Sequence, residues 1–148
     1  MASPVLVAVD FSPLTPALLA VAAEEARVRG AELQLVHVAA PEPAFVGREV
    51  DPPEMRDVVA RELREEHRRL QGLADELTAA GVRATAVCVQ GPTVEKIAAL
   101  AERVGAVRLV VGCHGRGPLA RALLGSVSAG LLRAAPCPVL VVPASRSA

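Results

Sequence analysis

The sequence is poor in aromatic residues and in cysteine. Its 148 residues include no tryptophan and no tyrosine, and Phe11 and Phe45 are the only phenylalanines. A hydrophobic core in this chain must therefore be aliphatic. Its three cysteines form no CxxC pair, which argues against the disulfide framework that small secreted domains use.

The sequence also lacks an excess of charge of either sign. Lysine and arginine total 16, as do aspartate and glutamate, so the net charge is zero. Without an overall field we expect neither nucleic acid nor a membrane surface as a partner. No apolar run reaches membrane-spanning length, and the first nine residues lack the basic start of a signal peptide. We therefore expect a cytoplasmic protein.

Short apolar runs alternate with helical patterns along the whole chain. The runs predict strands at residues 4–9, 31–38, 82–89, 107–111 and 138–142. Helices are expected from Ser12-Pro13 to about residue 29, and over residues 54–80, 93–104 and 126–134. Strands that are apolar throughout indicate a parallel sheet covered on both sides. We therefore predict a single α/β domain, residues 1–148, with an open five-stranded parallel sheet and helices on both faces.

The most informative stretch follows the fourth predicted strand. It contains four glycines and two serines within 17 residues, at positions 112, 115, 117, 125, 126 and 128. Glycine allows close approach of a ligand to the backbone, and serine can cap a helix. Unpaired amides at a helix N-terminus favour an anion such as phosphate. The spacing is neither GxGxxG nor GxxxxGK[ST] but G-x-x-G, nine residues, then G-S.

This spacing resembles that of the ATP-binding branch of the universal stress protein family. Three other segments resemble the family's first strand with its acidic turn, its second strand and its last strand, namely residues 5–12, 35–38 and 135–142. Together they cover essentially the whole chain. The resemblance implies a Rossmann-like fold of the adenine nucleotide alpha-hydrolase type. It also implies a regulator of the stress response that binds ATP, or else ADP or AMP.

The resemblance further implies which residues bind the nucleotide. Those expected at the adenosine moiety are Ala8, Val9, Asp10, Val38, Val111 and Gly112. Those expected at the phosphates are Gly115, Gly125, Ser126, Val127 and Ser128. Chemistry alone adds Arg116 and Arg121 as charged contacts to the phosphate tail. Mg²⁺ would be carried by the phosphates, because the sequence shows no dedicated carboxylate cluster.

Several of these residues have a simpler interpretation. Asp10 can merely cap the following helix, and the glycines can merely form a tight turn. Cys113 and His114 have no further ligand at zinc spacing, so we expect no metal site. Redox modification of Cys113, at a loop that favours anions, is a further hypothesis.

Three classes of function stay open: a nucleotide-dependent regulator, a slow ATPase, and an interaction module that binds no nucleotide. The absence of a Walker lysine disfavours an enzyme, so we expect at most weak ATP hydrolysis. The intact glycine spacing disfavours the third class. The resemblance also implies a homodimer, plausibly formed through the apolar last strand at residues 139–142. The protein partner of such a regulator is not indicated by the sequence.

Overall fold

The computed structural model describes residues 3–39, 53–113 and 125–144. Within these ranges the chain forms a five-stranded parallel sheet in the order β3-β2-β1-β4-β5. The strands are β1 (Val5–Ala8), β2 (Leu33–Ala39), β3 (Ala84–Gln90), β4 (Arg108–Gly112) and β5 (Val139–Val142). The predicted sheet is confirmed, and each predicted strand begins within about two residues of the observed one.

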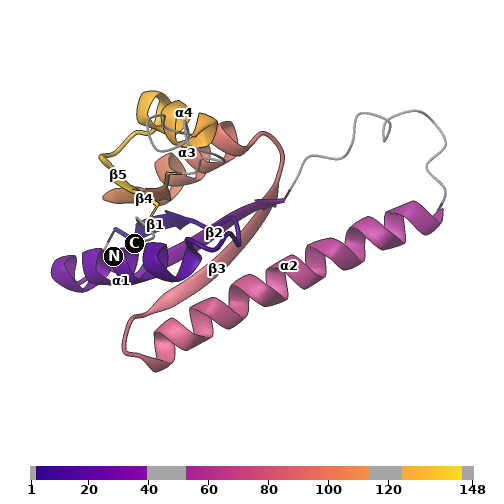
Figure 1. The fold of residues 1–148 in the computed structure, drawn as a ribbon, viewed down its shortest axis with the longest axis horizontal. Coiled ribbons are helices and arrows are strands. Elements are labelled where there is room, and N and C mark those ends of the chain that lie inside the picture. The colour runs from indigo at the N-terminus through magenta and orange to yellow at the C-terminus, as the bar shows by residue number, and fades with distance from the viewer. Residues whose placement is uncertain (1–2, 40–52, 114–124, 145–148) are drawn as a thin grey trace.

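Four helices cover the sheet, two on each face (Figure 1). They are α1 (Thr15–Arg29), α2 (Pro53–Ala79), α3 (Thr93–Val104) and α4 (Ser126–Ala134). The first two pack on one face and the last two on the other. One end of the long helix α2 extends well beyond the sheet (Figure 1). None of the helices in the described ranges has the length and apolar character needed to cross a membrane.

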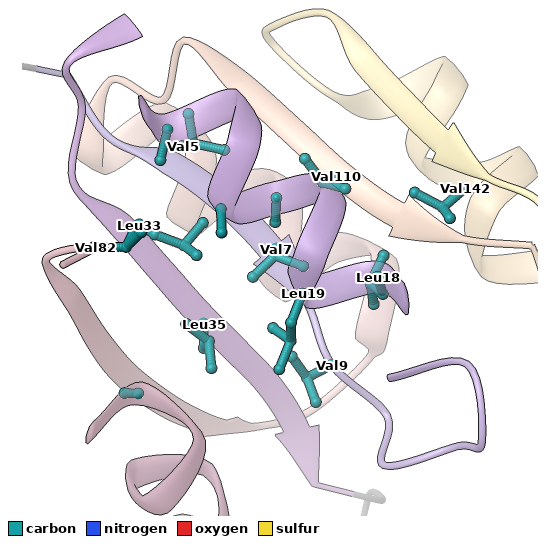
Figure 2. Packing of buried hydrophobic residues seen from close by; sticks show 14 of the residues in the cluster. Val5, Val7, Val9, Leu18, Leu19, Leu33, Leu35, Val82, Val110 and Val142 are labelled. Carbon is teal, nitrogen blue, oxygen red and sulfur yellow. The ribbon is translucent and has the colours of Figure 1, made fainter. Parts of the chain in front are cut away.

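The sheet buries side chains on both faces, which explains why its strands are apolar throughout. Val5, Val7 and Val9 point toward α1, which contributes Leu18 and Leu19 to the same cluster (Figure 2). Leu70 of α2 also belongs to this cluster. The alternate strand residues Leu6, Val36, Leu109 and Val111 belong to a second cluster under α3 and α4, together with Leu131 of α4. The two-residue period of a strand places neighbours on opposite faces, so a single run serves both clusters.

Glycines end the helices where the sequence predicts. Gly30 and Gly105 adopt left-handed conformations, with φ of 59° and 65°, directly after α1 and α3. Each donates its backbone N–H to carbonyls of the preceding turn, as expected for a glycine C-cap.

The start of α1 differs from the prediction. The helix begins at Thr15 with Leu14 at the N-cap, so Ser12 is not the capping residue and Pro13 is not the first helical residue. Ser12 instead takes part in a turn, in which its N–H donates to Asp10 Oδ1 at 3.1 Å. Its own Oγ accepts from the Leu14 N–H at 3.3 Å. This turn occupies the chain between β1 and α1, so the helix begins at Thr15 and not at Pro13 as predicted.

Candidate functional site

A cavity of about 760 Å³ lies at the carboxyl ends of β1, β2 and β4. After β1 the chain adds β2 and β3 on one side of that strand, and then β4 and β5 on its other side. The carboxyl ends of β1 and β4 therefore mark a switch point in strand order. Open parallel sheets bind ligands at such points, and cavities of 300–1,000 Å³ hold small molecules. The strand ends meet the starts of three helices here, because residues before or at the beginning of α1, α3 and α4 also line the cavity.

Ten of the predicted site residues line this one cavity. They are Ala8, Val9, Asp10, Val38, Val111, Gly112, Gly125, Ser126, Val127 and Ser128. Gly115, Arg116 and Arg121 lie outside the described residues. The structure thus brings the described members of the predicted set together from segments more than 100 residues apart. Their contacts to a nucleotide remain a prediction.

The turn after β1 presents Asp10 to the cavity. Val9 is buried and anchored by its N–H, which donates to the Val36 carbonyl of β2 at 2.8 Å. Asp10 itself is exposed, and one carboxylate oxygen accepts from the Ser12 N–H. The simpler interpretation of Asp10 as a helix cap is wrong, because Leu14 is the N-cap of α1 and Asp10 accepts within the preceding turn instead. A carboxylate has further lone pairs, so the same group can also accept from a ligand hydroxyl or amine.

His37 also lines the cavity, although the sequence patterns gave no reason to expect it there. Its Nδ1 lies 2.7 Å from the Val9 carbonyl oxygen. Because a carbonyl only accepts, Nδ1 carries the proton of this bond. Nε2 lies 3.3 Å from a carboxylate oxygen of Glu66 on α2, an ion pair when the ring carries a second proton. The sequence feature that could have indicated His37 is its position directly before Val38, near the carboxyl end of a strand.

At the end of β4, Gly112 provides a close approach between backbone and neighbouring side chains. A Cβ at this position would lie 2.8 Å from Cδ2 of Leu14, so a larger residue would force a shift. The Gly112 carbonyl accepts a hydrogen bond from the Ser128 hydroxyl at 2.7 Å. Ser128 is 2% exposed, so this bond links the first turn of α4 to the end of β4 inside the protein. Its hydroxyl proton is thus already engaged, and toward a phosphate Ser128 could contribute only through its backbone.

The N-terminus of α4 opens on the cavity. Gly125 occupies the N-cap with extended backbone, and no side chain caps the helix. Ser126 and Ser128 therefore do not cap α4 as the sequence suggested. The first amides of a helix have no partner within the helix, and together with its dipole they favour an anion. Ser126 and Val127 are exposed beside these amides.

The cysteines lie outside this cavity. Burial raises the pKa of the Cys88 thiol, and the nearby Glu66 carboxylate raises it further. Burial also raises the pKa of Cys137, against an opposing effect of Arg108. Both thiols are thus held in the protonated, less reactive form. In the described ranges, no three or more His, Cys, Asp or Glu side chains gather in a way that could hold a metal ion.

A profile of the universal stress protein family matches residues 1–143 of this chain. The chain belongs to that family. A universal stress protein of Thermus aquaticus is 35% identical over 139 residues, which cover 93% of this chain and 96% of the relative. A Mycobacterium tuberculosis universal stress protein is 36% identical, and the match covers 94% of this chain but 45% of that longer relative.

Solved structures of the family share the fold. The universal stress protein of Archaeoglobus fulgidus in complex with dAMP is 26% identical with a TM-score of 0.66, over 93% of this chain and 95% of that one. A universal stress protein in complex with cAMP is also 26% identical, with a TM-score of 0.61 over 96% and 98% of the two chains. Adenine nucleotides are therefore ligands of structural relatives of this chain.

Proposed function

We propose that this universal stress protein binds ATP in the cavity at the carboxyl ends of β1, β2 and β4, and regulates a stress response according to its nucleotide state. The observation that carries the proposal is the convergence of these strand ends with the α4 N-terminus on one cavity. That cavity offers an apolar wall, a carboxylate and the first amides of a helix. These are the groups that recognise a base, a sugar hydroxyl and a phosphate.

The two ends of the cavity suit the two ends of a nucleotide. The half-buried Ala8 and Val38 supply aliphatic surface against which a base can lie. Asp10 lies at the adjoining turn, where its carboxylate can accept from the adenosine. The α4 N-terminus at Gly125 and Ser126 is the phosphate end. The dAMP and cAMP complexes of relatives support an adenine ligand, and the length of the phosphate chain is our proposal.

The residues present fit Mg²⁺ only as a companion of the phosphates. Asp10 is the one carboxylate among the lining residues that the structure describes. Mg²⁺ commonly keeps several waters and binds through one or two carboxylates together with substrate phosphates. The ion would therefore enter with ATP and not before it.

We also propose that the protein is a homodimer formed through β5. This strand lies at an edge of the sheet, paired on one side only with β4. Its residues Val139, Leu140 and Val141 are half-buried within one copy of the chain. An edge with an unused row of backbone groups and apolar side chains is a site for pairing with another chain.

The nucleotide proposal is tested by thermal unfolding with and without Mg-ATP. A ligand that binds only the folded state, at about 100 times its dissociation constant, stabilises by about 2.7 kcal/mol. We expect this stabilisation in the native chain and a loss of about tenfold or more in affinity in Asp10→Asn, because a hydrogen bond to a charged group contributes about 1.5–3 kcal/mol. Asparagine retains the side-chain oxygen that accepts from Ser12 in the turn.

The matched control is Asp57→Asn, which makes the same change at an exposed position of α2. It should leave the stabilisation by Mg-ATP unchanged. A native chain whose melting temperature does not move at millimolar Mg-ATP would refute the proposal and favour a module that binds other proteins without nucleotide.

A further inference from the structure

Phe11 lies between a residue of the cavity and a residue of α2. Its ring centroid is 4.6 Å from that of His37, and the two rings are tilted by 45°. On α2, the guanidinium carbon of Arg69 lies 4.4 Å from the centroid of the Phe11 ring. These distances correspond to an aromatic pair and a cation–π contact. Phe11 thus connects the cavity wall at His37 to the helix that crosses the outer face of the sheet.

The backbone of Phe11 depends on this packing. Its φ is +60°, and among the described residues it is the only one other than glycine with a positive φ. A bulky residue rarely adopts this conformation, so the surroundings must hold it there. Phe11 is preceded by Asp10, and its conformation directs how the Asp10–Ser12 turn faces the cavity. A change at the Phe11 ring is therefore transmitted to the turn.

Two residues of α2 reach this cluster from successive turns of the helix. Arg69 contacts Phe11, and Glu66 lies 3.3 Å from His37, which in turn is bonded to the Val9 carbonyl at 2.7 Å. Residues three apart share one face of a helix. Neither Glu66 nor Arg69 lines the nucleotide cavity itself. The helix therefore holds the Val9–Ser12 turn at two points without being part of the site.

A second hollow, of about 860 Å³, is an open groove between α1 and α2. It is lined by Phe11, Thr15, Leu19, Arg69 and Leu73, among others. Leu70 and Ala74 hold α2 on the sheet with fully buried side chains, whereas Arg69 is exposed at this groove beside its contact with Phe11. Farther along, α2 extends beyond the sheet (Figure 1), so a small rotation near Arg69 displaces its far end.

We propose that α2 senses the occupancy of the nucleotide cavity through Phe11 and His37. The inference rests on the proposed function, because the ligand that fixes the Asp10 turn is the nucleotide. We call α2 docked when Arg69 contacts Phe11, as in this structure, and released when that contact is lost. A ligand that prefers the turn as the docked helix holds it will favour the docked arrangement. A ligand can shift such an equilibrium only by its differential affinity for the two arrangements. The coupling is reciprocal, so a change that releases α2 must lower the affinity of the cavity for the nucleotide.

This reciprocity gives a test on residues outside the site. Arg69→Ala removes the cation over Phe11, and a cation–π contact at an exposed position corresponds to an affinity change of about two- to fivefold. We expect ATP to bind Arg69→Ala more weakly, by up to that factor, in calorimetric titration of the full chain, because the energy of the lost contact is the upper limit of the coupling. Arg69→Lys, which retains a cation over the ring, should restore most of the affinity.

Arg68→Ala is the matched control on the same helix. Arg68 pairs with Glu65 at 3.5 Å, and its side chain is 78% exposed. Its removal should leave the ATP affinity unchanged. Equal affinities in Arg69→Ala and Arg68→Ala would overturn the inference while leaving the proposed function intact. Failure of the native chain to bind ATP would overturn the proposed function and the inference together.

Hydrogen exchange provides a second measurement. If Phe11 had only a structural role, replacing it would not change how strongly ATP protects the amides of α2. In the native chain, ATP should slow amide exchange in α2 around residues 63–72, although none of the lining residues that the structure describes belongs to α2. Phe11→Leu removes the ring and leaves the lining side chains in place. ATP bound to this variant should no longer protect α2. Protection of α2 by ATP that is equal in Phe11→Leu and in the native chain would overturn the proposed route.

Discussion

Ser128→Ala tests the link between the two walls of the cavity. The Ser128 hydroxyl is buried and donates to the Gly112 carbonyl at 2.7 Å, which fastens the first turn of α4 to the end of β4. Alanine removes the donor, while the half-buried Gly112 still faces the cavity, where water can reach it. The loss is therefore that of an ordinary hydrogen bond, about 0.5–1.5 kcal/mol. For a chain of this length, 1 kcal/mol shifts the melting temperature by about 2–4 °C.

We therefore expect Ser128→Ala to melt about 1–6 °C below the native chain. The melting curve can be followed by circular dichroism at 222 nm, and the free energy of unfolding by urea denaturation. Ser126→Ala is the matched control, since Ser126 is exposed two residues earlier and makes no capping bond. It should change stability by less than about 0.5 kcal/mol. A free energy of unfolding that is the same in the two variants would refute the assigned role of the Ser128 hydrogen bond.

Two further predictions concern the cysteines and the edge strand. Burial raises the pKa of Cys88 and Cys137 in the folded chain above the ordinary value of 9.0. Their contribution to the free energy of unfolding is therefore fully present below pH 9.0 and is lost as the pH rises above that value. Urea denaturation between pH 7 and 10 should show that loss in the native chain, and a Cys88→Ser/Cys137→Ser variant that falls equally steeply would contradict it. For β5, light scattering should give twice the chain mass of 15.3 kDa, and a mass of one chain at all concentrations would exclude the proposed dimer.

The sequence predicted the sheet well because both of its faces are buried. A strand such as Val5–Ala8 is apolar at each position, which separates it clearly from the amphipathic helices around it. Gly30 and Gly105 mark helix ends by a conformation that glycine adopts most readily. The ends of buried strands then indicated the position of the cavity, since parallel strands share one carboxyl edge.

The turn after β1 could not be predicted in the same way. Pro13 after Ser12 resembles a helix start, but Asp10 and Ser12 form a turn that delays α1 until Thr15. The positive φ of Phe11 arises from tertiary contacts and has no local sequence signal. The role of His37 likewise depends on pairing between strands, because its partners Val9 and Glu66 come from other elements.

The role of Ser128 shows how burial decides between two readings of one residue. A serine at a helix start after glycine is a natural phosphate ligand or cap. In the structure its side chain points inward to Gly112, whereas Ser126 is the exposed serine at the cavity. Only the direction of the first helical turn distinguishes the two, and the sequence spacing is compatible with both.

The central claim, that this chain holds an adenine nucleotide, is tested most directly by equilibrium dialysis of ATP against the purified chain. Since the chain contains no tryptophan or tyrosine, its own absorbance near 260 nm is small, and retained nucleotide can be measured in the presence of protein. We expect saturation at one ATP for each chain, with binding weakened in Asp10→Asn and unchanged in Asp57→Asn. A folded native chain that retains no ATP above the concentration in the buffer, at millimolar nucleotide and Mg²⁺, would contradict it.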